Sequence, residues 1–216
     1  MNGGLIMRRR WLEALGLTSL ILCIVSLAIL ITINFRPLYV FDIGHLNILD
    51  YTTLSEKELL KNFDLLMRYL NTPWITELKL PDFPMSTSGA FHFYEVKRLF
   101  LLDYAVFAVT LIPAGLYLRY LKNHGFWRVI RPMQWAMLLP VLFGFLMMIG
   151  FDQFFVAFHG LFFNNDAWLF NPATDPIINV LPEQFFMHCF ILFFVLIEGF
   201  FFFFYWLGRR DLKIEK

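Results

Sequence analysis

The sequence has little charge and almost no cysteine. Asp, Glu, Lys and Arg make up only 16% of its 216 residues, against 59% hydrophobic residues, and 28 residues are Phe. This balance is far from that of a soluble domain and is typical of a membrane protein. The formal net charge is only +1, so nothing in the charge suggests nucleic acid as a partner.

The two cysteines, Cys23 and Cys189, lie in apolar runs rather than in aqueous loops. We therefore expect no structural disulfide and interpret both as small buried side chains. Cys23 follows Leu22, where a lipoprotein signal would have a small residue, and no signal-peptidase cleavage site follows the run. We expect the N-terminal run to be an uncleaved anchor and the chain not to be lipidated itself.

The common catalytic motifs are also missing. The sequence contains no Gly-x-Ser-x-Gly, no His-Glu-x-x-His, no paired cysteine ligands and no Walker loop. A covalent acyl-enzyme on Ser or Cys and zinc hydrolysis of the familiar kind are therefore not expected. Two histidines could be half of a metal site, but no third clear ligand stands near them, so we expect no metal.

Four hydrophobic runs are each close to the ~20 residues that cross the hydrocarbon core of a bilayer. We place them at about residues 11–34, 99–121, 133–151 and 185–207. The fold class that we expect is an all-α membrane protein of four transmembrane helices, with residues 1–216 forming a single membrane domain.

Positive charge predicts the orientation of this domain. Eleven of the eighteen Lys and Arg residues fall on one side of the four-span arrangement: Arg8, Arg9, Arg10, Arg119, Lys122, Arg128, Arg131, Arg209, Arg210, Lys213 and Lys216. The segment 152–184 has none. Because positive charge favours the cytoplasmic side, we expect both termini inside, and segments 35–98 and 152–184 outside as a small extracytoplasmic cap. The protein would then be a multi-pass protein of the cell membrane.

Within segment 35–98, Ser55 and Glu58 have the spacing of a capping box. They open an amphipathic run that we expect to be a helix ending near Asn71, with its apolar face on the membrane surface or on the bundle. Residues 86–89 read as a loop.

Segment 152–184 is unusually rich in Phe for a loop. We interpret 152–163 as a short helix in or dipping into the membrane interface, aromatic face down, which ends at 164–166. Residues 168–176 read as a turn-rich connection. The fourth span then begins near Leu181-Pro182-Glu183, because Pro suits the first helical turn and Glu its positive end.

Histidine is the remaining candidate for acid–base chemistry, since its unperturbed pKa lies near neutrality. His92 and His159 stand in the two segments expected outside, and we take them as the catalytic candidates. We interpret His45 and His124 as structural, whereas His188 could either be structural or line the site.

Two acidic residues fall within the predicted spans, where a carboxylate is costly. Asp103 could orient a histidine or Arg98, or could make only a structural hydrogen bond. We assign no role to Glu198.

Two stretches resemble one known family. His92-Phe93-Tyr94-Glu95-Val96 is similar to its His-x-x-acid-Val element. The second signature is longer and runs over Phe151-Asp152 to Phe158-His159, Trp168-Leu169-Phe170, Thr174-Asp175-Pro176 and Leu181-Pro182-Glu183-Gln184-Phe185-Phe186. The family is that of the lipoprotein intramolecular transacylases of Gram-positive bacteria, and the resemblance covers essentially the whole chain.

The resemblance implies an acyltransferase without a cofactor. Its substrate would be a lipoprotein whose N-terminal Cys carries a diacylglyceryl group. The enzyme would move the sn-2 acyl chain to the α-amino group of that same Cys, giving a lyso-form lipoprotein. By position, the two functional histidines of the family correspond to His92 and His159.

The residues and the resemblance together lead to one hypothesis. His159 is the general base and His92 orients the substrate or polarises its ester carbonyl. Four further residues could orient a histidine or support the oxyanion: Asp152, Asp175, Asn171 and Arg98. Trp168, Phe155 and Phe158 would line the acyl chains.

The alternatives are an acyl hydrolase of lipoproteins or phospholipids, and a non-catalytic membrane module that binds a protein or senses a metal. The partners that we expect are the lipoprotein substrate and membrane lipids, without nucleic acid. The sequence does not fix the oligomeric state, for which we expect a monomer.

Overall fold

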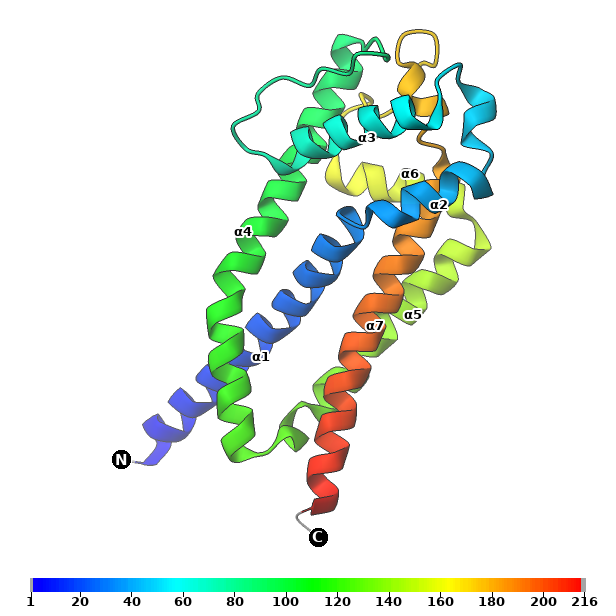
Figure 1. Ribbon diagram of the computed structural model, residues 1–216. Helices are drawn as coiled ribbons and strands as arrows, with labels where there is room; N and C mark the ends of the chain where they lie inside the picture. The colour runs from blue at the N-terminus through cyan, green and yellow to red at the C-terminus, as the bar shows by residue number, and fades with distance from the viewer. Residues whose placement is uncertain (1, 215–216) are drawn as a thin grey trace. The chain divides into compact units, whose positions relative to one another are not determined.

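The computed structural model describes residues 2–214, with side chains for residue 7 and residues 10–212. In that range the regular secondary structure is all helical, without a strand (Figure 1). The helices are α1 (Asn2–Ile33), α2 (Arg36–His45), α3 (Glu56–Asn71), α4 (Thr87–His124), α5 (Ile130–Ile149), α6 (Phe151–Phe162) and α7 (Glu183–Ile214), with short 3-10 turns η1 (Ile48–Tyr51), η2 (Phe126–Val129) and η3 (Pro176–Asn179). The side chains of Arg8, Arg9 and Lys213, and residue Lys216, which entered the orientation argument, lie outside the described part.

Four stretches are long and apolar enough to cross a membrane, as the sequence predicted. They cover Arg10–Ile33, Thr87–His124, Phe126–Ile149 and Glu183–Leu212. Helix α4 has 38 residues, which corresponds to about 57 Å at the helical rise and exceeds the ~30 Å of a hydrocarbon core. Part of α4 therefore has to extend beyond the hydrocarbon, and the all-α class with four spanning helices is confirmed.

The chain divides into two compact units. Unit 1 holds residues 1–31, 103–145 and 192–216, and unit 2 holds residues 32–102 and 146–191. In unit 1, Leu20, Tyr117 and Met133 belong to one buried core.

Polar contacts in unit 1 include a group around Glu13. Glu13 accepts a hydrogen bond from the Tyr120 hydroxyl at 2.6 Å and pairs with Arg128 at 3.1 Å. The Asp103 carboxyl is hydrogen-bonded to the Ser26 side chain, which favours the structural interpretation of this acid over a part in orienting a histidine. Cys23 is free and half-buried.

The core of unit 2 is built around α3. Its predicted capping box is present, since the Ser55 hydroxyl accepts from the Glu58 backbone N–H and the Glu58 carboxylate accepts from the Ser55 backbone N–H. The apolar face of α3 does not lie on the membrane surface. It packs within unit 2, where Phe63 stacks on Tyr39 of α2 with ring centroids 4.0 Å apart.

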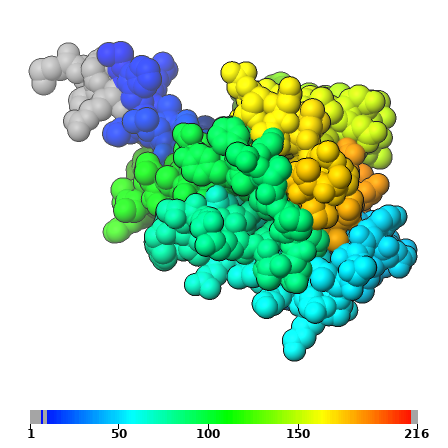
Figure 2. All heavy atoms as spheres, turned by 90° about the horizontal axis from the view of Figure 1, so that it is seen from above, coloured from blue at the N-terminus to red at the C-terminus, as the bar shows by residue number. Residues whose placement is uncertain are grey.

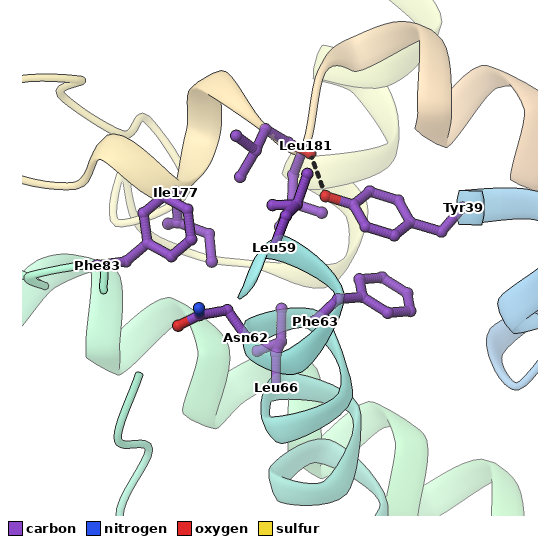
Figure 3. Close-up of a pocket in the computed structure, with 9 residues that line it drawn as sticks. Tyr39, Leu59, Asn62, Phe63, Leu66, Phe83, Ile177 and Leu181 are labelled. Atoms are coloured by element: carbon purple, nitrogen blue, oxygen red, sulfur yellow. Dashed lines mark hydrogen bonds between the residues drawn. The ribbon is translucent and has the colours of Figure 1, made fainter. Parts of the chain in front are cut away.

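A small apolar cavity lies within this core, lined by Tyr39, Leu59, Asn62, Phe63, Leu66, Phe83, Ile177, Val180 and Leu181. Figure 3 shows the labelled side chains converging from α2, α3, the segment between α3 and α4, and the segment around η3. The Tyr39 hydroxyl donates a hydrogen bond to the Val180 carbonyl at 2.8 Å (Figure 3). The segment that precedes α7 is thereby fixed to α2.

The first turn of α4 differs from the prediction. Residues 87–89 are helical rather than a loop, and the Ser86 hydroxyl accepts a hydrogen bond from the Gly89 N–H at 2.9 Å. Further along α4, the buried Lys97 ammonium donates to the carbonyls of Thr72 and Ile75. These contacts secure the N-terminal part of α4 to the chain that follows α3.

Candidate active site

Helix α6 positions His159. The imidazole Nδ1 lies 2.8 Å from the Phe155 carbonyl one helical turn earlier. A carbonyl can only accept, so the hydrogen bond places the proton of the neutral ring on Nδ1 and leaves the lone pair on Nε2. His159 is thus held in the tautomer that a base acting through Nε2 requires.

Aromatic rings cover His159 on several sides. Trp168 stacks on it with ring centroids 4.5 Å apart, and the Phe155 and Phe158 rings lie at 4.2 and 5.8 Å. The side chains that were predicted to line the acyl chains therefore all contact this histidine. Burial lowers the pKa of His159 below its ordinary value, although the hydrogen bond to the Phe155 carbonyl acts in the opposite direction. The ring is accordingly neutral at pH 7 and able to accept a proton.

His92 lies in the second turn of α4, and its side chain is 6% exposed. Its ring meets Phe163 and Phe170 edge to face, with centroids 4.7 and 5.6 Å apart. The Nδ1 atom is buried without a hydrogen-bond partner. Neither phenylalanine was among the predicted lining residues, although Phe170 stood in the second signature.

The two candidate histidines lie side by side. Their ring centroids are 5.8 Å apart, although 67 positions separate them in the sequence. At this distance a single small group can contact both rings. Figure 2 shows the segments of unit 2 near residues 90 (green), 165 (yellow) and 180 (orange) next to one another on one face.

Asp175 is buried, but its hydrogen bonds do not go to a histidine. Its carboxylate accepts from the Ser86 backbone N–H and from the Thr174 hydroxyl, each at 2.7 Å. Burial alone would raise the pKa of this carboxyl, yet the bonds from Thr174 and Ser86 hold the pKa below its ordinary value. Asp175 therefore secures the beginning of the helix that carries His92.

Three other predicted support residues lie away from the rings. The Asn171 side chain accepts from the Ala173 N–H at 3.0 Å and so stabilises its own turn. Asp152 is exposed and hydrogen-bonded to Glu183. Arg98 is exposed on α4, six residues beyond His92 and hence on a different helical face.

Sequence reasoning missed two residues that border the histidines. Glu95 lies one turn after His92 on the same face of α4, and its Oε1 accepts a hydrogen bond from the Asn165 amide at 2.9 Å. The signal was present in part, because Glu95 is the acidic position of the first motif. Its partner could not be identified without the fold.

A second histidine cluster is built on α2 and α7. His188 Nδ1 lies 2.8 Å from Oδ1 of the fully buried Asp42, and the His45 ring is 5.8 Å from the His188 ring. His188 is therefore paired with Asp42, which supports its structural interpretation. In the described range, no three His, Cys, Asp or Glu side chains are grouped so that they could hold a metal ion.

Comparisons with known proteins agree with this arrangement. The family model of the lipoprotein intramolecular transacylase Lit matches residues 14–186. No match is found among curated protein sequences. The solved structure of the integral membrane lipoprotein intramolecular transacylase of Bacillus cereus is 32% identical, covers 95% of this chain and 96% of its own, and has a TM-score of 0.84.

Two variants of the Bacillus cereus enzyme, in which a histidine is replaced by arginine or by alanine, also match. Both are 32% identical with a TM-score of 0.81; they cover 95% of this chain and 92% and 94% of their own chains. With a family model matching well over half of the chain and a relative of this identity and coverage, the chain belongs to the lipoprotein intramolecular transacylase family.

Proposed function

We propose that this protein transfers the sn-2 acyl chain of a diacylglyceryl-Cys lipoprotein to the α-amino group of the same Cys. The observation that carries the proposal is the pair of buried imidazoles, His92 and His159, 5.8 Å apart inside an aromatic shell. Family membership supports the reaction class, because the related Bacillus cereus protein is named as a lipoprotein intramolecular transacylase.

His159 acts as the base. The neutral amine attacks the ester carbonyl carbon, a C–N bond forms, and the carbonyl electron pair moves onto oxygen. Nε2 of His159 takes a proton from the attacking nitrogen. When the tetrahedral intermediate collapses, the C–O bond to glycerol breaks and the same Nε2–H returns its proton to the leaving glycerol oxygen. The products are an amide and a free hydroxyl, and the histidine is regenerated.

His92 stabilises the oxyanion. A neutral imidazole with its proton on Nε2 can donate one hydrogen bond to the developing negative charge, and a well-placed donor of this kind is worth about 3 kcal/mol. The donor acts in a site enclosed by Phe163 and Phe170, where a low dielectric strengthens the interaction.

The substrate itself supplies the remaining rate enhancement. Amine and ester belong to one molecule, and well-oriented intramolecular reactions reach effective molarities of about 10⁵–10⁸ M. The aromatic residues around His159 fold the lipid back on itself and exclude water, so the acyl group passes to nitrogen rather than to hydroxide. No metal or other cofactor takes part in this sequence of steps.

The site faces the extracytoplasmic side, with both termini in the cytoplasm. The distribution of Lys and Arg supports this orientation, since segment 152–184 contains none. Lipoproteins that carry a diacylglyceryl-Cys would then reach the histidines from the outer leaflet.

The test is expression in a bacterium whose lipoproteins keep a free α-amino group, followed by mass spectrometry of the N-terminal lipopeptide. We expect an unchanged total mass with one acyl group on nitrogen. Loss of one acyl mass would identify a hydrolase instead. An unmodified lipopeptide beside well-expressed protein would favour a non-catalytic binding module.

A further inference from the structure

Near the start of α4, two buried polar atoms of the described structure have no hydrogen-bond partner. They are Nδ1 of His92 and Oε2 of Glu95. Residues three apart on a helix are neighbours, so the two side chains lie next to each other on α4. A buried acceptor without a donor costs free energy comparable to a lost hydrogen bond, more when it is charged. An unpartnered pair of this kind indicates a place for a ligand.

The carboxylate of Glu95 is held in position from the opposite side. Its Oε1 accepts from the side-chain NH₂ group of Asn165 at 2.9 Å, while the side-chain oxygen Oδ1 of Asn165 accepts from the Ala167 N–H at 2.9 Å. The next residue, Trp168, stacks on His159. Glu95 is thereby joined to the same loop that covers His159, and only its second oxygen remains available.

Within residues 10–212, no cation takes up that oxygen. Lys97, two residues further along α4, donates to the carbonyls of Thr72 and Ile75 and lies 4.3 Å above the Tyr69 ring. Its charge is therefore directed toward the chain after α3 rather than toward Glu95.

The two acceptors, Nδ1 of His92 and Oε2 of Glu95, determine which ligand group can donate to both. With its proton on Nε2, the His92 ring presents a lone pair on Nδ1, and the Glu95 carboxylate adds a negative charge. A primary ammonium carries three donors and one positive charge, whereas a hydroxyl has only one donor. We propose that Glu95 and His92 bind the α-ammonium group of the substrate Cys and hold it beside His159.

This assignment rests on the proposed function and adds the group that recognises the free amine. It agrees with the part given to His92, since the tautomer that accepts at Nδ1 also keeps a proton on Nε2 for the ester oxygen. A free α-amino group has a pKa of about 7.7–8.0, so most substrate molecules arrive as ammonium. The bound ammonium gives one proton to solvent, and the neutral amine then attacks the ester with His159 as the base. Glu95 would thus select substrates whose N-terminus has not yet been acylated.

The experiment compares two synthetic diacylglyceryl-Cys peptides, one with a free amine and one N-acetylated, as ligands of detergent-solubilised protein. Wild type is measured beside Glu95→Gln, which keeps an acceptor for Asn165 but removes the charge. Glu77→Gln is the matched control, because Glu77 is exposed and pairs with the exposed Lys79. Acyl transfer by each variant is measured in the same preparation.

We expect wild type and Glu77→Gln to bind the free-amine peptide more tightly than the acetylated one. In Glu95→Gln this preference should fall by about tenfold, the loss expected for a hydrogen bond to a charged group. An unchanged preference for the free-amine peptide in Glu95→Gln overturns the assignment. Equal binding of both peptides by wild type overturns it as well, and this result does not depend on whether the variant folds. Absence of acyl transfer in wild type would instead contradict the proposed function itself.

Discussion

Gly89, in the first turn of α4, lies directly against the carboxylate of Asp175. A Cβ atom at this position would overlap Oδ1 of Asp175 and come within 2.8 Å of the Phe170 ring. The close approach lets Asp175 accept from the Ser86 N–H. The glycine therefore sets how closely the start of the His92 helix approaches the loop that contributes Phe170.

Gly89→Ala tests this relationship. We expect the added methyl group to move α4 away from Asp175, at a cost of about 1–3 kcal/mol for overpacking, and to lower acyl transfer by displacing His92. The free energy of unfolding and the initial rate are the measurements. Gly115→Ala is the control, since a Cβ there meets nothing within 4 Å; equal behaviour of the two variants would refute the argument.

Replacement of His159 by Gln should remove the base and leave the fold intact. We expect acyl transfer to fall by about 10²–10⁴-fold, the usual contribution of a general base, while the unfolding temperature changes little. The control is His124→Gln, because His124 makes the same contact to a carbonyl one turn earlier, at 3.0 Å, on an exposed surface. Retained activity in His159→Gln would contradict the assignment of the base.

The stability of the protein should depend on pH through His159. Burial lowers its folded-state pKa below 6.5, so the unfolded chain binds a proton more readily than the folded one. The stabilising contribution is complete above pH 6.5 and is lost as pH falls from there through the folded pKa. Between pH 7 and pH 5, wild type should therefore lose more unfolding free energy than His159→Gln. Parallel curves of unfolding free energy against pH for the two proteins would show that folding does not change the pKa of His159.

Trp168 is expected to keep water from the reacting ester. In Trp168→Ala the His159 ring loses its stacking partner at 4.5 Å, and water gains access to the base. We expect free fatty acid to appear beside the N-acyl product, whereas Trp168→Phe should retain transfer. Product analysis by mass spectrometry distinguishes the fatty acid from the N-acyl product. If Trp168→Ala transfers the acyl chain at the wild-type rate and releases no fatty acid, Trp168 does not shield the ester from water.

The fold was predictable where the pattern is local. The four apolar runs, the capping box at Ser55 and the helix around His159 were all predicted from spacing and composition. Helix α2 was not predicted, because its ten residues follow the first span without a strong amphipathic period. Residues 86–89 were predicted as a loop, whereas α4 begins at Thr87, since the Ser-Thr-Ser-Gly stretch resembles a loop until the Ser86 cap is known.

The site was predictable only in its main residues. His92 and His159 were identified by residue type and motif, and the structure brings their rings together. The contacts of Asp175 and the pairing of Glu95 with Asn165 depend on packing between segments 70 or more positions apart. Such contacts leave no periodic signal in a single sequence. Asp175 was predicted to orient a histidine or support the oxyanion, whereas its hydrogen bonds in the structure hold the start of α4.

The central claim is that the acyl group moves within one substrate molecule under the action of the two histidines. The most direct measurement is a crossover experiment with two lipopeptides, one carrying isotope-labelled acyl chains and the other an isotope-labelled peptide, mixed and incubated with the enzyme. We predict N-acyl products in which no acyl chain has changed peptide. Products that combine the acyl label of one with the peptide label of the other would contradict intramolecular transfer.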